Sequence, residues 1–475
     1  MNSDEFRRHG HHLIDWMADY MEHVRRYPVK SQVEPGEILG NIPADPPVDG
    51  EPFERIFEDF RQTVLPGITH WQHPSFFAYF PANSSPPSVL AEMLMATLGA
   101  QCMSWQTSPA ATELEEGVMR WLRSMIGLPP GFKGVIQDTA STATLCSLLT
   151  AREMRTEFQT NRQGMSGSGR FVVYCSSETH SSIEKAAKIA GLGSDNLRKV
   201  AVDDGFAMIP DALAEAVKED REKGLTPLCA VATIGTTGST AVDPLKDIGR
   251  ICSDNDLWLH VDAAYAGSAL LLPEMRWMIE GIEQADSFVF NPHKWMFTNF
   301  DCSAYFVRDE AALVRTFEIL PEYLKTKEAD RVKNFRDWGI QLGRRFRALK
   351  LWFVIRSYGT NGLSELIRKH ISMAQDLARR IGETDGFELL APTPLSVVCF
   401  RFKPRGLSNV AEINAFNERL LEAVNSTGKL YITHTKLRGI YSLRFVVAQT
   451  QVTPEDVEQG WREIESTARK LESEL

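Results

Sequence analysis

Several features that define other protein classes are missing from this 475-residue sequence. No run approaches the roughly 18 consecutive apolar residues that a membrane-spanning helix needs. The opening MNSDEFRRHG lacks the apolar core of a secretory signal. The seven cysteines are scattered, odd in number and form no CxxC pair, which favours buried, reduced thiols over disulfides or a zinc site. A soluble protein of the cytoplasm is therefore expected.

A basic surface is also lacking. The 52 Lys and Arg residues stand against 62 Asp and Glu residues, which gives a formal net charge of −10. Nucleic-acid phosphates favour a basic footprint, so nucleic acid is not an expected partner. A local basic run lies in a helix-like stretch and is interpreted as a salt-bridged or solvated helix face, not a phosphate-binding surface. It consists of Arg344, Arg345, Arg347 and Lys350.

Familiar catalytic loops are absent as well. The sequence has no GxGxxG dinucleotide loop, no GxxxxGK[ST] phosphate loop and no GxSxG elbow. His70 and His73 stand three apart, but Pro74 follows and no third ligand is near, so a metal site is not expected.

The amino-terminal part is predicted to form a helix followed by an extended strap. Apolar residues recur at helical spacing over the first 25 or so residues, with Ser3 as the expected cap. Six prolines between Pro28 and Pro52 exclude one continuous helix there. Such an arm suits packing on a neighbour or a partner subunit, and a helix folded on its own domain is the open alternative.

The middle of the chain alternates between strand-like and helical patterns. Near-continuous apolar strands alternating with helices predict an α/β fold with a mostly parallel sheet covered on both faces. The expected strands are 171–176, 228–235, 257–262, 287–291 and 303–308, with helices over 210–223 and 243–255. Beyond residue 356, strand-like runs at 396–402 and 441–447 and a final helix over 454–472 predict a smaller α+β domain.

Polar residues stand where several of these strands end, which is where open α/β sheets bind ligands. They are Thr139 and Ser141, His180, Asp262 and Lys294. The segment 139–141 precedes a helix expected over 142–154, whose free N–H groups and positive end suit an anion. A Lys–Asp salt bridge alone is the plain alternative, but the anion cradle favours pyridoxal 5′-phosphate (PLP) as a cofactor.

Several longer strings make the sequence similar to a known family. NPHKW, HVDAAYAGSA, THSS, SPAATELE, HWQHPSFFAYFP and LGRRFRALKLWF resemble the group II PLP-dependent decarboxylases, closest to the aromatic L-amino acid decarboxylases. The resemblance covers essentially the whole chain. It implies the type I aminotransferase-like fold and a homodimer with its active site at the subunit interface. It also implies an arm over 1–80 packed on the partner, a large PLP-binding domain over 81–355 and a small domain over 356–475.

The resemblance also implies roles for individual residues. Lys294 would hold the cofactor as a Schiff base, Asp262 would pair with the pyridinium nitrogen, Ala264 would lie against one ring face and His180 would stack on the other. Further cofactor-binding positions are Thr139, Ala140, Ser141, Thr237, Asn291 and His293.

The implied reaction is decarboxylation of an aromatic L-amino acid to the arylalkylamine and CO2, by way of an external aldimine and a quinonoid. The matching proton donor is Tyr323, on a segment suited to a loop that orders on substrate binding; an ordinary buried tyrosine is the alternative. The matching substrate pocket contains Trp71, Tyr79, Phe80, Pro81, Ala82, Met103, His180, His293 and Gly343. Gly343 matches a family position where a small residue leaves room for large rings, so the resemblance favours tryptophan-, tyrosine- or DOPA-like substrates.

Some positions depart from the animal members of that family. Asp138 replaces a glycine before the phosphate cradle and is expected to face away from the phosphate, since an unshielded acid there is unfavourable. Ala82, Pro86 and Met103 also differ, which leaves the preferred ring open.

Three rival functions are weighed. An aldehyde synthase of the same fold is disfavoured because Tyr323 and His180 are both present, and a non-catalytic PLP-binding scaffold because Lys294 and Asp262 are both retained. A glutamate or cysteine-sulfinate decarboxylase fits less well, since the pocket offers no obvious extra arginine.

Overall fold

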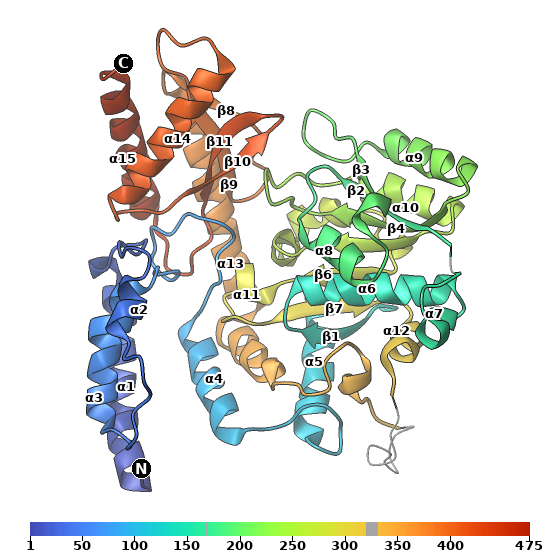
Figure 1. Ribbon diagram of the computed structural model, residues 1–475, viewed down its shortest axis with the longest axis horizontal. Coiled ribbons are helices and arrows are strands. Elements are labelled where there is room, and N and C mark those ends of the chain that lie inside the picture. The colour runs from blue at the N-terminus through green and yellow to red at the C-terminus, as the bar shows by residue number, and fades with distance from the viewer. Residues whose placement is uncertain (168, 320–330) are drawn as a thin grey trace. The chain divides into compact units, whose positions relative to one another are not determined.

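The computed structural model describes residues 1–167, 169–319 and 331–475 (Figure 1). The chain divides into two compact units. Unit 1 comprises Met1–Pro81, Asp376–Leu390 and Val398–Leu475, and unit 2 comprises Ala82–Gln375 and Ala391–Val397. The three-part division at residues 80 and 355 stays a prediction.

A seven-stranded sheet forms the centre of unit 2. Its strands are β1 (Lys133–Gln137), β2 (Phe171–Ser176), β3 (Leu197–Val200), β4 (Thr226–Thr233), β5 (Trp258–Asp262), β6 (Ser287–Phe290) and β7 (Ser303–Val307). They lie in the order β1-β7-β6-β5-β4-β2-β3. Only β7 among them runs against its neighbours. The predicted α/β fold with a mostly parallel sheet is confirmed.

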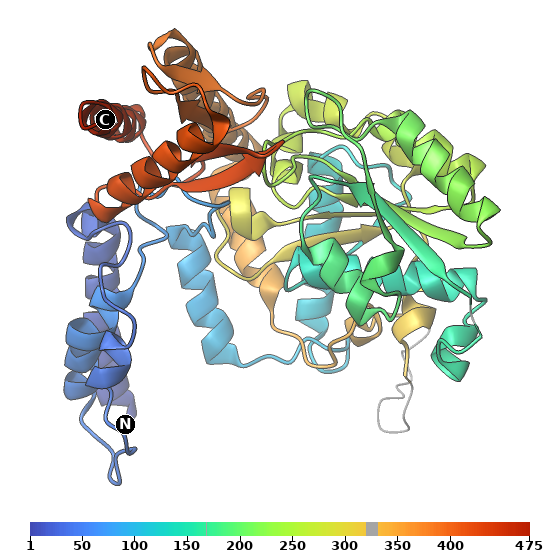
Figure 2. The same ribbon diagram turned by 45° about the horizontal axis from the view of Figure 1, so that its top comes forward.

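Helices cover both faces of this sheet (Figures 1 and 2). On one face, Val173 and Cys175 of β2 join a core cluster with residues of α6 and α8. On the other, the intervening Tyr174 donates a hydrogen bond from its hydroxyl to Asp220 of α9 at 3.0 Å. The helices of unit 2 are α4 (Pro86–Leu98), α5 (Pro109–Met125), α6 (Ala140–Arg155), α7 (Gln159–Gln163), α8 (Ser182–Ile189), α9 (Pro210–Glu222), α10 (Leu245–Asp254), α11 (Pro292–Trp295) and α12 (Glu310–Phe317), with α13 (Arg347–Glu383) continuing into unit 1.

Unit 1 contains a four-stranded sheet and several helices. The sheet order is β10-β11-β9-β8. Its strands are β8 (Phe387–Leu389), β9 (Val397–Phe402), β10 (Thr433–Leu437) and β11 (Ile440–Val446). The helices are α1 (Ser3–His23), α2 (Glu37–Asn41), α3 (Phe53–Asp59), α14 (Val410–Ser426) and α15 (Pro454–Glu472). Short turns of 3₁₀ or π type lie at 24–26, 60–64 and 65–67 in unit 1, and at 194–196, 266–271, 273–279, 282–284 and 335–337 in unit 2.

Two helix starts differ from the sequence prediction. Asn2, not Ser3, caps α1, because its side-chain oxygen accepts the N–H groups of Asp4 and Glu5. Helix α6 begins at Ala140, two residues before the predicted start, because the Thr139 side chain accepts the Thr142 N–H and so serves as its cap.

The basic run is held by acidic partners, as predicted. Arg344 lies 2.6 Å from Glu115, and Lys350 lies 3.0 Å from Glu92. Arg347 pairs with Asp301 at 2.8 Å. The run is not one helix, since α13 begins only at Arg347.

The cysteines are free and buried, which confirms the interpretation of their spacing. Among the described residues, no helix combines the length and the apolar character that crossing a bilayer requires. No grouping of three or more potential metal ligands occurs in that same part of the chain.

Candidate active site

The sheet brings most of the predicted cofactor-binding residues of unit 2 to one edge. Strands β1, β2, β4, β5 and β6 run in the same direction, so their carboxyl ends lie along the same edge. Thr139, His180, Thr237, Asp262 and Lys294 stand at or just beyond those ends. The fold therefore places these residues along one edge of the sheet, and their contact with a cofactor stays a prediction.

Helix α6 runs along β5 and brings its first turn towards Asp262. The Trp258 indole N–H donates to Ser147 at 2.8 Å, and His260 Nε2 lies 3.2 Å from the Thr144 hydroxyl. Both side chains point to the face on which α6 lies, and Asp262 shares that face by strand alternation. By extension along both elements, the start of α6, at Ala140, is directed towards the end of β5, which carries Asp262.

The Asp262 carboxylate is 4% exposed. Within the described residues it accepts one hydrogen bond, from the Ala264 N–H to Oδ1 at 3.0 Å. A carboxylate offers about four acceptor sites, so this buried group keeps capacity for a further donor. A charge held here without such a partner is costly.

Lys294 lies on the single-turn helix α11, which follows β6. Its N–H donates to the Asn291 carbonyl at 2.9 Å. Asn291 in turn donates its N–H to the Ala264 carbonyl at 2.9 Å and accepts the Ser303 hydroxyl at 2.7 Å. The loop after β6 is thus fastened to the loop after β5, which carries Asp262.

His180 stands in the electrostatic field of both charged residues. Burial lowers the pKa of its ring, while Asp262 opposes that shift and Lys294 adds to it. Ser182 donates its backbone N–H to His180 Nδ1 at 3.1 Å, so Nδ1 is an acceptor and the neutral ring carries its proton on Nε2.

His293, beside the lysine, is fixed in the same way. Cys302 donates its N–H to His293 Nδ1 at 2.9 Å. Burial lowers the pKa of His293 to about 3, and the charge of Lys294 contributes to the lowering. Both histidines are therefore neutral near pH 7 and hold a proton on Nε2.

The expected anion cradle lies at the start of α6. The first N–H groups of a helix, here those of Ala140 and Ser141, have no intrahelical partner and suit an anion. Thr139 is otherwise engaged, because its N–H donates to Asp138 at 2.6 Å and its hydroxyl caps the helix. The second Asp138 oxygen accepts the Gln341 amide at 2.8 Å. These bonds fix the Asp138 carboxylate, and its orientation relative to a phosphate stays a prediction.

The predicted substrate residues fall in both units. In unit 1, Trp71 stacks on Tyr79 with ring centroids 5.6 Å apart, and Phe80 lies under the Arg444 guanidinium, whose carbon is 4.5 Å from the ring centroid. Pro81 is the last residue of the segment Met1–Pro81 of unit 1. Tyr323 lies outside the described residues.

In unit 2, Ala82 is half-buried. The segments that carry Met103 and Gly343 each contact another part of the same unit. The Arg336 N–H donates to the Met103 carbonyl at 2.9 Å. A Cβ added to Gly343 would lie 3.3 Å from the Gln101 side-chain nitrogen, so the absence of a side chain at 343 leaves this contact uncrowded.

Three residues that the sequence reasoning missed hold site residues in place. Asn83 donates its side-chain amide to the Lys294 carbonyl, Ser303 binds Asn291, and Ser182 binds His180. The serine two residues after His180, within THSS, was the only local signal; the other two partners are remote in sequence.

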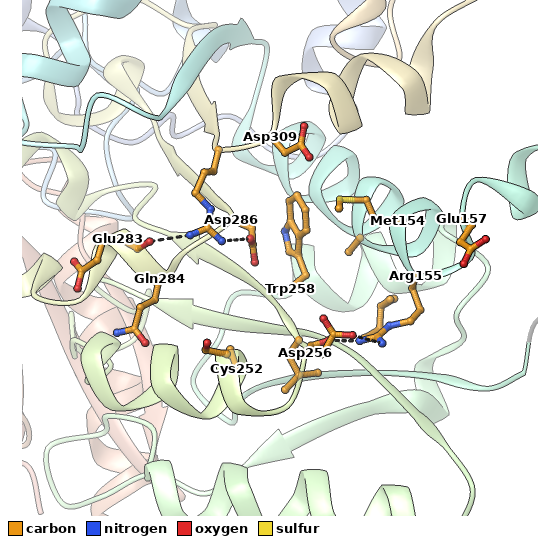
Figure 3. A pocket seen from close by; sticks show the side chains of 15 residues that line it. Met154, Arg155, Glu157, Cys252, Asp256, Trp258, Glu283, Gln284, Asp286 and Asp309 are labelled. Carbon is orange, nitrogen blue, oxygen red and sulfur yellow. Dashed lines mark hydrogen bonds and ion pairs between the residues drawn. The ribbon is translucent and has the colours of Figure 1, made fainter.

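A groove of about 650 Å³ lies at the opposite, amino-end edge of the same sheet (Figure 3). Its lining includes Trp258, the first residue of β5, and two ion pairs. Arg155 pairs with Asp256, and Arg308 pairs with Asp286, each at 2.7 Å. The groove is therefore separate from the strand-end cluster, and its two arginines are already paired.

The residues at the carboxyl edge fit PLP in their chemistry. The buried Asp262 carboxylate has acceptor capacity for a pyridinium N–H, Lys294 supplies a primary amine, and the start of α6 suits a phosphate. Ala264, two residues after Asp262, has only a methyl side chain, which would leave room for a ring.

Comparison with known proteins agrees with this chemistry. Residues 35–403 match the model of the pyridoxal-dependent decarboxylase conserved domain. The chain is 44% identical to tyrosine decarboxylase 4 of Petroselinum crispum, over 99% of this chain and 94% of the relative. It is 41% identical to phenylacetaldehyde synthase of Petunia hybrida, over 99% of this chain and 96% of the relative.

A solved structure with the same fold contains the cofactor. The crystal structure of Oryza sativa TDC with PLP and tryptamine superposes with a TM-score of 0.96 at 35% identity and covers 99% of both chains. This protein accordingly belongs to the pyridoxal-dependent decarboxylase family, and pyridoxal 5′-phosphate is its cofactor.

Proposed function

We propose that this protein decarboxylates aromatic L-amino acids to the corresponding arylalkylamines and CO2. The observation that carries the proposal is the buried Asp262 carboxylate, which keeps acceptor capacity and shares its strand-end edge with Lys294. Full-length similarity to a tyrosine decarboxylase supports the aromatic substrate class.

Each residue of the edge has a distinct task in this proposal. When bound, PLP supplies an electron-poor ring that accepts the electron pair left when CO2 departs. Asp262 would keep the ring nitrogen protonated by accepting its N–H, and Lys294 would bond to the aldehyde carbon and yield it to the substrate amine. His180 would cover one face of the ring and Ala264 the other. Neutral His180 and His293 each offer an Nε2–H donor.

The phosphate would be held by Ala140, Ser141 and the segment at Thr237, with Asn291 holding the neighbouring loop. Thr139 contributes by capping α6.

Orientation of the substrate supplies a large part of the rate. The bond to the departing carboxylate must stand perpendicular to the ring, and holding a reacting group in position can contribute about 7–11 kcal/mol. The residues proposed to contact the aromatic substrate are Trp71, Tyr79, Phe80, Pro81, Ala82, Met103, His180, His293 and Gly343. Tyr323 is the proposed donor of the proton that replaces CO2 at the α-carbon.

An aldehyde synthase reaction, in which decarboxylation is coupled to oxidative deamination, is the second candidate. Its support is the similarity to a phenylacetaldehyde synthase. The presence of both Tyr323 and His180 favours simple decarboxylation.

The proposal includes an assembly and a location. We place the protein in the cytoplasm as a homodimer with its active site at the subunit interface. In that assembly, residues 1–80 form an arm on the partner, 81–355 the PLP-binding domain and 356–475 the small domain. Sedimentation at micromolar concentration should give twice the 53.4 kDa chain mass, and a monomer would contradict this assembly.

One experiment tests the reaction directly. The purified holoprotein is incubated with equimolar tyrosine, DOPA, tryptophan, phenylalanine, histidine and glutamate, and products are identified by mass. Aromatic amines in equal amount to CO2 are expected, and Lys294→Ala should abolish both the amines and the visible band of the bound cofactor. Hydrogen peroxide and ammonia in stoichiometric yield with CO2 would identify the aldehyde synthase instead.

A further inference from the structure

The helix that carries Lys294 is too short to bond most of its own carbonyl groups. Helix α11 spans four residues, Pro292–Trp295. The last four carbonyls of any helix lack intrahelical partners, so in α11 nearly all of them need outside donors. A buried carbonyl left without a donor costs about as much as a lost hydrogen bond.

Asn83 supplies donors to two successive carbonyls of this turn. Its backbone N–H donates to the His293 carbonyl at 3.0 Å, and its side-chain Nδ2 donates to the Lys294 carbonyl at 2.5 Å. The preceding Pro292 carbonyl accepts the Met296 N–H at 3.1 Å. Asn83 is 1% exposed, so these bonds are shielded from competing water.

The rest of the loop is anchored independently of Asn83. The Ser85 hydroxyl donates to the Phe297 carbonyl at 2.7 Å, and the Asn299 N–H donates to Ser88 at 2.9 Å. Arg347 holds Asp301 at 2.8 Å. Removing the Asn83 side-chain amide should therefore leave the loop folded. Only the peptide group at Lys294 should become free to rotate.

We infer that Asn83 is a positioning residue that orients the Lys294 backbone, and with it the amine that carries the cofactor. The inference rests on the proposed role of Lys294. The orientation of the peptide plane at Lys294 sets the direction of its Cα–Cβ bond. The amine at the end of that side chain must reach a cofactor that other residues hold in place. A bond formed through a misdirected side chain is strained and breaks more readily.

The test compares three variants of the holoprotein. Asn83→Ala removes the amide, and Asn83→Asp keeps its shape but loses the donor. Ser85→Ala is the matched control, because it deletes a buried hydrogen bond to the same loop three residues beyond Lys294. The readouts are the rate of PLP loss during dialysis, followed by the visible band, and the thermal midpoint.

Both Asn83 variants should lose PLP about tenfold faster than the wild type, the factor that one buried hydrogen bond typically controls. Ser85→Ala should lower the thermal midpoint without changing that rate. Equal rates in the wild type and Asn83→Asp would overturn the inference, as would an equal acceleration in Ser85→Ala. If Asn83→Ala does not fold, Asn83→Asp decides.

A Lys294→Ala variant separates this inference from the proposed function. If it lacks the visible band while the Asn83 variants behave like the wild type, only the role of Asn83 fails. If it keeps the band, the role proposed for Lys294 fails first.

Discussion

Asp262 illustrates how one residue acquires its role from its surroundings. Asp262 is 4% exposed, and its carboxylate accepts a single backbone N–H within the described residues. If it served the structure alone, burying its charge would destabilise the fold. At the strand-end edge that it shares with Lys294 and the start of α6, the same group is the proposed partner of a protonated heterocycle. In the proposed function, its value lies in the hydrogen bond that it can still accept.

Replacing Asp262 by asparagine should reduce amine formation by about 10- to 100-fold, because a neutral amide cannot stabilise a protonated ring nitrogen and hydrogen bonds to charged groups are the stronger ones. Initial rates of tyramine or tryptamine release measure the effect. Glu283→Gln, at the opposite edge of the sheet, is the control. Wild-type rates in Asp262→Asn would exclude the proposed role.

At Tyr323, substitution by phenylalanine should stop amine formation while PLP stays bound, since it removes only the hydroxyl that is proposed to donate the proton. Amine yield and the visible band of the cofactor are measured on the same sample. Unchanged amine production would assign the proton transfer to another group.

Elements are held in place by caps and buried ion pairs. Thr139 was predicted to contact the cofactor, and in the structure its hydroxyl caps α6. Arg344 precedes α13 and connects it to α5 and β1, since it bonds Glu115 and the Ile136 carbonyl. Such connections maintain the edge at which the site is built.

We expect Thr139→Ala to lower the free energy of unfolding by about 1 kcal/mol, because the first turn of α6 loses its cap. Thr139→Ser keeps the oxygen and should restore most of that loss. Denaturant midpoints of the holoprotein measure both. Equal midpoints for the two variants would show that the cap contributes nothing.

The Arg344→Met variant should be destabilised by about 3 kcal/mol, because it leaves the buried Glu115 carboxylate without its cation. Arg368→Met, which breaks the exposed 2.8 Å pair with Glu274, should cost less than about 1 kcal/mol. Denaturant unfolding of the two variants side by side gives the comparison, and similar losses would contradict the argument from burial.

Acid should weaken the whole molecule through its buried histidines. Burial lowers the pKa of His260 and of His73 to about 4. The unfolded chain binds these protons near pH 6.5, so between pH 6.5 and 4 it holds more protons than the folded chain. The part of the unfolding free energy that these two histidines contribute is therefore present in full above pH 6.5. It is lost as the pH falls towards 4.

His260 alone should account for about 2 kcal/mol of the stability lost between pH 7.5 and pH 5. In His260→Gln, the difference between unfolding free energies at the two pH values should shrink by that amount. The exposed His11→Gln is the control. An unchanged difference in His260→Gln would show that this ring does not titrate on unfolding.

The sequence alone determined the alternation of elements and the residues at the strand ends. Apolar periodicity and strand length are local properties, so the strands ending near Ser176, Asp262 and Phe290 could be predicted to within a residue or two. Its similarity to a known family added the cofactor and the roles that are proposed for individual residues. Helix starts were less certain, since a cap depends on which side chain reaches the free N–H groups, as at Asn2 and Thr139.

Only the tertiary structure decided which remote groups meet. The contact of Asn83 with Lys294 spans more than 200 positions, and Gln341 reaches Asp138 across a similar interval. Such pairs depend on strand order and helix direction, and a single chain carries no local signal for them because hydrogen bonds of this kind form between surfaces that meet only on folding.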